Sequence, residues 1–395
     1  MTASPAANAA EVVAREAVPA AVPEVYRRLG IRPIINASAT LTRLGGSVMP
    51  EVAVKAMAEA SQHFVPLDEL QLRVGERIAS LTNNEACYVS SGAAAGIAMS
   101  VAACIAGTDL GLIAAFPYLE NVAKNEVIIH VNQRNGYDYA ARQTGARIVE
   151  IGGTADDLRA AIGERTACIL WFAGAHFADG ALPVEEVIAI GHEHGVPVVV
   201  DAAAQVPLVA NLWHFTRELG ADLAIFSGGK GLRGPQSSGL VLGRPDLVAG
   251  CRLNGSPNHS LGRPMKVGKE EMVGLLAAVE YALAQDEPAQ LAGYEAIVQR
   301  WIDGLAGLPG ISADRSYPSE AGQPHGRALV TIGPAAALSR DDVVAALLAG
   351  DPPIAVAAVG AEGIALNPQT IQPGEDEIVL RRLREILLSG RAAAS

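Results

Sequence analysis

The hydrophobic positions of this chain fall into short apolar runs that alternate with segments of helical spacing. From about residue 83 onward the apolar runs predict strands, and the segments between them predict helices. The predicted strands are Ala86–Val89, Leu110–Ala115, Val127–Val131, Arg147–Ile151, Cys168–Phe172, Val196–Val200, Leu223–Phe226 and Gly239–Leu242. Alternation of this kind predicts an α/β domain with a doubly wound, mostly parallel sheet.

The pattern changes after about residue 265. Lys269–Ala284 places its apolar side chains on one helical face, and Glu375–Leu388 predicts a closing helix. Between these helices, Ala328–Ile332 and Ile354–Val359 alternate as strands do. The C-terminal part is therefore predicted to be a smaller α+β domain.

These patterns predict four parts along the chain. They are a flexible N-terminal tail (1–24), an N-terminal arm with helices (25–80), a large domain (81–262), and a linking helix with the small C-terminal domain (263–395).

Composition narrows the class of protein. Half of the 395 residues are hydrophobic but only 4% are aromatic, which suits helices packed closely on a buried sheet. The net charge of -12 argues against a nucleic-acid or anionic-membrane partner, because both need clustered Lys and Arg. The four cysteines show neither metal-site nor disulfide-framework spacing, and no stretch reads as a secretory signal or a membrane span. We therefore expect a cytoplasmic protein without a metal site.

One lysine stands among glycines directly after an apolar strand. The run Ser227-Gly-Gly-Lys230-Gly follows Leu223–Phe226. An amine in apolar surroundings has a lowered pKa and can form a Schiff base. Glycines there would let the backbone approach a planar ligand and adopt positive φ. The alternative interpretation of Lys230 alone is an ordinary turn lysine.

An aspartate strengthens the case for Schiff-base chemistry. Asp201 follows Val196–Val200 directly and precedes Lys230 by 29 residues. Because ligands bind at the carboxyl ends of parallel strands, we expect the two side chains at one edge of the sheet. A carboxylate there can keep a pyridinium nitrogen protonated, which makes pyridoxal 5'-phosphate (PLP) an electron sink. Asp201 alone could also be a helix cap; the pair favours PLP.

A phosphate site is expected nearby. Ser90, Ser91, Gly92 and Ala93 stand between a strand and a helix of small residues, where free backbone N–H groups bind anions. Ser227, three residues before the lysine, is a further hydroxyl for the same phosphate.

With these motifs the chain resembles the fold-type I PLP enzymes, which have the aspartate-aminotransferase-like fold. Within them it is similar to the selenocysteine synthase-like branch, and most to the D-glucosaminate-6-phosphate ammonia-lyase-like proteins. The segments that carry the resemblance are Ile34–Ser47, Val89–Ala94, Val200–Gln205, Phe226–Pro235 and Gly262–Glu270. The resemblance implies a seven-stranded sheet, Lys230 as the Schiff-base lysine, and a homodimer or higher homo-oligomer with its active site near the subunit boundary.

Other site residues are candidates only. His130, Arg134 and Tyr137 compete for the place stacked on the cofactor ring. Gln205 is a candidate contact of the ring oxygen, and His176 is a candidate acid or base.

Substrate ligands are expected from two polar segments. Thr42 and Arg43 are candidates for the substrate entrance. Arg263 and Lys266 are candidates that bring positive charge to a phosphate or a substrate carboxylate, and their alternative is a solvated helix start.

The resemblance implies a lyase acting on a small-molecule amino acid. The expected reaction is α,β-elimination from a β-hydroxy 2-amino acid or amino sugar acid, giving a 2-keto acid and ammonia. Racemase or epimerase, aminotransferase and aldolase chemistry share Lys230 and Asp201 and stay open. Selenium transfer on seryl-tRNA is disfavoured by the acidic charge, and a non-catalytic scaffold by the presence of both residues.

Overall fold

The computed structural model describes residues 22–392, which divide into two compact units. The large unit comprises Thr40–Glu295 and Ser316–Arg327. The small unit comprises the described parts of Met1–Ala39, Ala296–Arg315 and Ala328–Ser395. Nearly all of the predicted tail, 1–24, lies outside the described residues, and the other predicted boundaries stay predictions.

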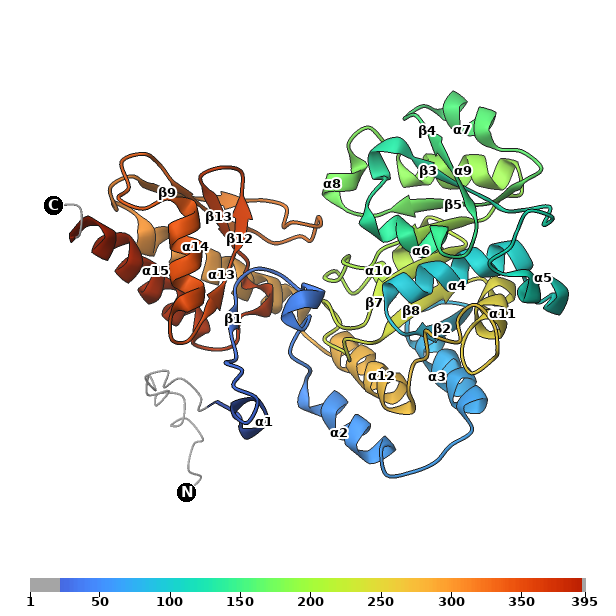
Figure 1. Cartoon of the computed structure of the whole chain (residues 1–395), viewed down its shortest axis with the longest axis horizontal. Helices are drawn as coiled ribbons and strands as arrows, with labels where there is room; N and C mark the ends of the chain where they lie inside the picture. Colours follow the sequence, from blue (N-terminus) through green and yellow to red (C-terminus); the bar gives the residue numbers. More distant parts are fainter. Residues whose placement is uncertain (1–21, 393–395) are drawn as a thin grey trace, which may run out of the picture. The chain divides into compact units, whose positions relative to one another are not determined.

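The large unit is built on a seven-stranded sheet with the order β2-β8-β7-β6-β5-β3-β4 (Figure 1). The strands are β2 (Ala86–Ser90), β3 (Glu126–His130), β4 (Arg147–Ile151), β5 (Thr166–Phe172), β6 (Val198–Asp201), β7 (Leu223–Ser227) and β8 (Gly239–Gly243). Strand β8 is antiparallel to β2 and β7, and the other pairs of neighbours are parallel. The predicted mostly parallel seven-stranded sheet is confirmed.

Both faces of this sheet are buried, as β5 illustrates. Ile169 and Trp171 join one hydrophobic cluster, whereas Leu170 and Phe172 join the cluster on the other face. Successive side chains of a strand point to opposite faces, so a strand covered on both sides is apolar at every position. This explains why the strands appear in the sequence as continuous apolar runs.

Helices cover the two faces, with α4 packed on β7 and β8 and α3 on β2. The helices of the large unit are α2 (Glu51–Ala60), α3 (Leu67–Leu81), α4 (Ala93–Ala106), α5 (Leu110–Ala115), α6 (Tyr139–Arg142), α7 (Ala155–Ala161), α8 (Ala175–Ala178), α9 (Val184–Glu193), α10 (Asn211–Trp213), α11 (Pro245–Asn254) and α12 (Lys269–Leu283).

One predicted strand is wrong, because Leu110–Ala115 forms helix α5. Asp109 precedes it in an extended conformation, and its carboxylate accepts hydrogen bonds from the N–H groups of Gly111 and Leu112. This is N-cap geometry, which satisfies backbone donors that a new helix leaves unpaired. Asp109 was thus the sequence signal for a helix, whereas the apolar content of Leu110–Ala115 alone suggested a strand.

The small unit has its own sheet and its own core. Its four strands follow the order β12-β13-β10-β9, and β13 is antiparallel to both β10 and β12. The strands are β9 (Ile311–Ser316), β10 (Arg327–Ile332), β12 (Ala357–Val359) and β13 (Gly363–Leu366), while β1 (Ile35–Asn36) and β11 (Ile354–Ala355) form a separate parallel pair. The predicted strand Ile354–Val359 is thus divided between β11 and β12, which belong to different sheets.

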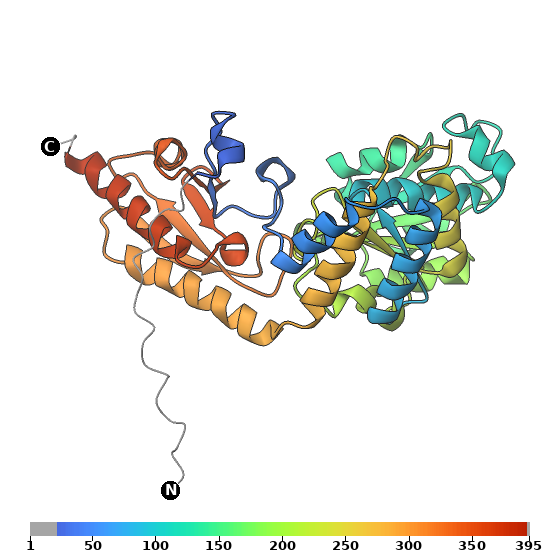
Figure 2. The same ribbon diagram turned by 90° about the horizontal axis from the view of Figure 1, so that it is seen from below.

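Three helices gather around these strands (Figure 2). They are α13 (Glu287–Leu305), α14 (Arg340–Ala349) and α15 (Glu375–Ala392), and the short α1 (Glu24–Arg27) precedes β1. Trp301 of α13 is fully buried among them, and its indole N–H donates to the carbonyl of Asp376 at 2.9 Å. The expected smaller α+β domain is confirmed. Within residues 22–392, no helix is both long and apolar enough to cross a membrane.

Candidate active site

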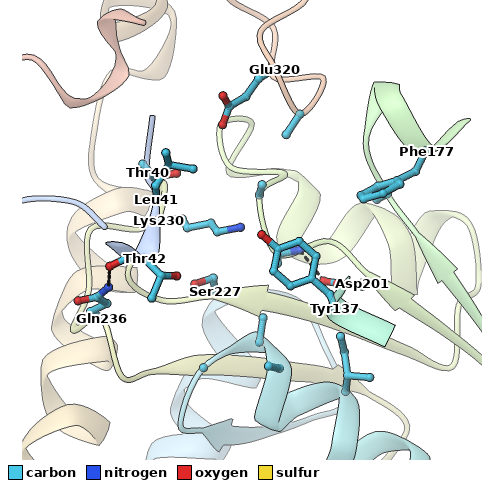
Figure 3. Close-up of a pocket in the computed structure, with 18 of the residues that line it drawn as sticks. Thr40, Leu41, Thr42, Tyr137, Phe177, Asp201, Ser227, Lys230, Gln236 and Glu320 are labelled. Atoms are coloured by element: carbon cyan, nitrogen blue, oxygen red, sulfur yellow. Dashed lines mark hydrogen bonds between the residues drawn. The ribbon is translucent and has the colours of Figure 1, made fainter. Parts of the chain in front are cut away.

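A cavity of about 900 Å³ lies in the large unit at the carboxyl edge of the parallel strands (Figure 3). Asp201 ends β6, Ser227 ends β7, and the first residues of α4 follow β2. The cavity brings together the predicted site residues Thr42, Ser91, Gly92, Ala93, Tyr137, His176, Asp201, Ser227 and Lys230. Residues separated by as much as 188 positions, from Thr42 to Lys230, thus share one cavity because the strand ends share one edge of the sheet.

Lys230 lies in the turn after β7, and its side chain points into the cavity toward Tyr137 and Asp201 (Figure 3). The turn is held from outside the sheet by Ser47, whose hydroxyl donates to the carbonyls of Gly229 and Lys230 at 3.0 and 2.8 Å. The lysine backbone is therefore fixed while the amine stays in the cavity.

The glycines around the lysine serve packing within the chain. A Cβ on Gly231 would come within 2.0 Å of the Val206 carbonyl oxygen, and one on Gly229 within 2.5 Å of the Gln236 Cα. Neither contact leaves room for a side chain. The prediction that these glycines make room for a ligand or adopt positive φ is therefore corrected. They are needed because the turn itself leaves no space for a Cβ atom.

Asp201 is 7% exposed, and its carboxylate accepts a hydrogen bond from the Ala203 N–H at 3.0 Å. Burial raises the pKa of Asp201 from 3.8 to about 6, and the Ala203 hydrogen bond and the positive charge of Lys230 only partly oppose this rise. A buried carboxylate with a raised pKa at the wall of a cavity is typical of a functional site. It would be stabilised by a cationic N–H donor from a ligand.

This pKa has a consequence for stability in the ligand-free chain. The folded chain binds the Asp201 proton more tightly than the unfolded chain, so stability is lost as the pH rises from about 4 to about 6. This pKa shift corresponds to a change of at most about 3 kcal/mol in the free energy of unfolding. We expect ligand-free Asp201→Asn to be more stable than the wild type by about 1–3 kcal/mol at pH 8, with a smaller gain at pH 4. Urea unfolding at both pH values measures this, and an equal difference at the two would contradict it.

The start of α4 has the features of an anion site. Gly92 is the N-cap residue with φ of 110°, and a Cβ there would meet nothing within 4 Å, so the helix start faces open space. The first N–H groups of a helix have no partner within it and carry partial positive charge. Ser91 and Ala93 line the same place, whereas the buried Ser90 hydroxyl donates to the Gly92 carbonyl and supports the turn.

Of the three competing ring-face residues, the structure places Tyr137 at the cavity. His130 ends β3 fully buried, and both of its ring nitrogens are without a partner among the described residues. Arg134 is paired with Asp138 and Glu150 and does not line the cavity. Its predicted contact with the cofactor stays a prediction, and the geometry favours Tyr137.

The substrate-side candidates are divided in the same way. Thr42 lines the cavity, and its carbonyl accepts a hydrogen bond from Gln236, another lining residue, at 2.7 Å. Arg43, Arg263 and Lys266 are exposed and do not line the cavity. Their roles as substrate ligands remain predictions.

His176 and Gln205 both contact the segment Ser316–Arg327. The Nδ1 atom of His176 lies 3.2 Å from the carbonyl oxygen of Glu320. The Gln205 amide does not line the cavity; it donates to the carbonyl of Ala321 at 2.8 Å and that of Ala173 at 3.4 Å. Gln205 thus holds two lining residues, Ala173 and Ala321, without lining the cavity itself.

Sequence reasoning missed several lining residues: Thr40, Leu41, Phe177, Gln236, Ser237 and Glu320. Thr40 and Leu41 lie within Ile34–Ser47, which carries the family resemblance, and Phe177 directly follows His176, so their neighbourhood was a signal. No signal in the sequence pointed to Glu320. It lies between β9 and β10, two strands of the small unit's sheet, but its segment belongs to the large unit.

Comparisons with known proteins agree with this geometry. The family model of the L-seryl-tRNA selenium transferases (SelA) matches residues 34–293. A 5'-C-glycyluridine monooxygenase-decarboxylase from a Streptomyces species is 35% identical, with 92% of each chain covered. The D-glucosaminate-6-phosphate ammonia lyase of Salmonella typhimurium is 34% identical, covering 92% of this chain and 98% of the relative.

A solved structure of a D-glucosaminate-6-phosphate ammonia-lyase superposes with a TM-score of 0.80 at 32% identity, covering 94% of this chain and all of the other. These matches span the large unit and most of the small unit, and they confirm the resemblance drawn from the motifs. The chain belongs to the SelA family of fold-type I PLP-dependent enzymes.

Proposed function

We propose that this chain binds PLP in the cavity with Lys230 as the covalent attachment point. The residues present fit the cofactor. The buried Asp201 carboxylate has a raised pKa and suits a pyridinium N–H, and the open start of α4 suits a phosphate. A cavity of about 900 Å³ holds both the cofactor and a small substrate.

Each residue then has a defined task. Asp201 would hold the ring nitrogen protonated, Tyr137 would cover one face of the ring, and Ser91, Gly92, Ala93 and Ser227 would hold the phosphate. When bound, PLP supplies an electron sink that makes the Cα–H bond of an amino acid acidic. Lys230 would remove that proton once the substrate has taken its place on the cofactor.

We propose α,β-elimination from a β-hydroxy 2-amino acid or amino sugar acid as the reaction. The observation that carries this is the meeting of Lys230, Asp201 and the α4 start in one cavity, in a chain similar along nearly its whole length to an ammonia lyase. The products would be a 2-keto acid and ammonia. We also propose a homodimer or higher homo-oligomer, as is typical of fold-type I enzymes.

The reaction is tested by a panel of D- and L-serine, D- and L-threonine and D-glucosaminate, with and without a 6-phosphate. We expect 2-keto acid and ammonia in equal amounts, without a keto-acid co-substrate and without oxygen. Solvent deuterium entering Cα without ammonia release would instead indicate a racemase or epimerase.

The relative with 35% identity favours a second candidate, an oxygen-dependent decarboxylation of an amino acid. Its name states a monooxygenase and decarboxylase activity, and it matches this chain over the same 92%. An oxygen electrode and carbon dioxide detection separate the candidates. Oxygen uptake together with carbon dioxide release would show that the chain catalyses this decarboxylation rather than the elimination.

A further inference from the structure

Glu320 faces the cavity from the segment between β9 and β10. Its carboxylate lies on the opposite side of Lys230 from Ser227, so Lys230 stands between the glutamate and the expected phosphate end (Figure 3). A substrate bound beside Lys230 would share the cavity with Glu320. The Glu320 side chain is 34% exposed, as suits a group that meets a ligand in a partly enclosed cavity.

The glutamate is held in place by reciprocal amide bonds. Gln205 donates to the carbonyl of Ala321 at 2.8 Å, and Gln323 donates to the carbonyl of Ala204 at 3.0 Å. Both bonds lie directly after Glu320 in the chain and hold its segment against the loop that follows β6, the strand that Asp201 ends. The backbone that carries Glu320 is thus anchored beside the end of β6 within the large unit.

The surroundings of Glu320 favour proton retention. Burial raises its pKa, and the charges of Arg327, Lys230 and His176 oppose this only in part. Arg327 is the nearest of these groups, with its Nη1 atom 3.9 Å from the carboxylate, beyond hydrogen-bond distance. A carboxyl with a raised pKa holds its proton more tightly and can act as a general acid.

His176 is the less suitable donor. Its Nδ1 atom lies 3.2 Å from the Glu320 carbonyl oxygen, which can only accept a hydrogen bond. The Nδ1–H group is therefore engaged with this carbonyl and is not available to a leaving group.

We propose that Glu320 is the general acid that protonates the leaving group on Cβ, a role that rests on the proposed elimination. Lys230 takes the Cα proton, and the electron pair of the Cα–H bond becomes the second Cα–Cβ bond. The Cβ–O bond breaks with its electrons on oxygen, which takes the Glu320 proton and leaves as water. Hydrolysis of the unsaturated amine consumes one water and gives the 2-keto acid and ammonia. Glu320 regains a proton from solvent, and Lys230 releases its own.

A pair of probes with one carbon skeleton tests this role. Serine loses hydroxide, which needs a proton, whereas β-chloroalanine loses chloride, which does not. For Glu320→Gln we expect ammonia release from serine, in its accepted enantiomer, to fall about 10²-fold or more. Release from β-chloroalanine should fall less than about threefold. The matched control Glu186→Gln, exposed on α9, should leave both rates unchanged.

A second readout needs no turnover. In the ligand-free chain, Asp201 should give one protonated-carboxyl component in both proteins, whereas the wild type minus Glu320→Gln infrared difference should show a second component that titrates above pH 4.5. Equal losses on both probes, or no loss on serine, would overturn this role while the elimination stands. If the wild type releases ammonia from neither probe and from no member of the substrate panel, the proposed function fails and this role fails with it.

Discussion

Lys230→Ala should lower ammonia release by about 10³-fold or more, because the variant loses both the covalent anchor of the cofactor and the base that removes the Cα proton. The Lys230 side chain has no hydrogen bond that the fold depends on among those described, since the turn is held by backbone carbonyls that accept from Ser47. The variant should therefore fold. Steady-state ammonia release, with circular dichroism as the check of folding, measures both.

Lys124→Ala is the matched control for this change. Lys124 is exposed and does not line the cavity, so its removal tests whether the loss of any lysine charge matters. We expect Lys124→Ala to keep its rate within a few-fold, because an exposed charge outside the cavity contributes little. A similar loss in both variants would point to general electrostatics rather than to a reactive amine.

Asp201→Asn should slow the reaction by roughly 10²–10³-fold, because a neutral amide cannot hold a pyridinium charge. The asparagine keeps the shape and an oxygen for the Ala203 N–H, so the change removes charge with little change in packing. Turnover at saturating cofactor and substrate measures the effect.

The same variant carries the opposite expectation for stability in the ligand-free chain, where removal of a buried charge is favourable. Slower turnover together with higher ligand-free stability would support a carboxylate placed for a ligand. Unchanged turnover would show that Asp201 does not contact the cofactor ring.

The strands that carry the site were predictable because burial on both faces makes them continuous apolar runs. Polar residues directly after such runs, such as Asp201 after Val200 and Lys230 after the Ser-Gly-Gly turn, therefore stand out. The edge of the sheet at which the cavity lies follows from strand direction. For these reasons the cavity's centre could be inferred from the sequence.

The rest depended on contacts between distant segments. Apolar content could not separate α5 from a strand, and only the Asp109 cap distinguishes them. Glu320 reaches the cavity because Gln205 and Gln323 hold its segment against the loop after β6, a contact that spans more than a hundred residues. No local pattern records such a contact. The rim of a site is therefore less predictable than its centre.

We propose above all that Lys230 holds the cofactor, and borohydride reduction followed by peptide mapping tests this attachment directly. The sequence has five lysines: Lys55, Lys124, Lys230, Lys266 and Lys269. Trypsin cuts after Arg217 and Arg233, and it does not cut at a modified lysine. We expect one peptide, Glu218–Arg233, that carries the mass of the reduced cofactor and is uncut at Lys230. An adduct on any of the other four lysines, or no adduct on the PLP-loaded protein, would contradict it.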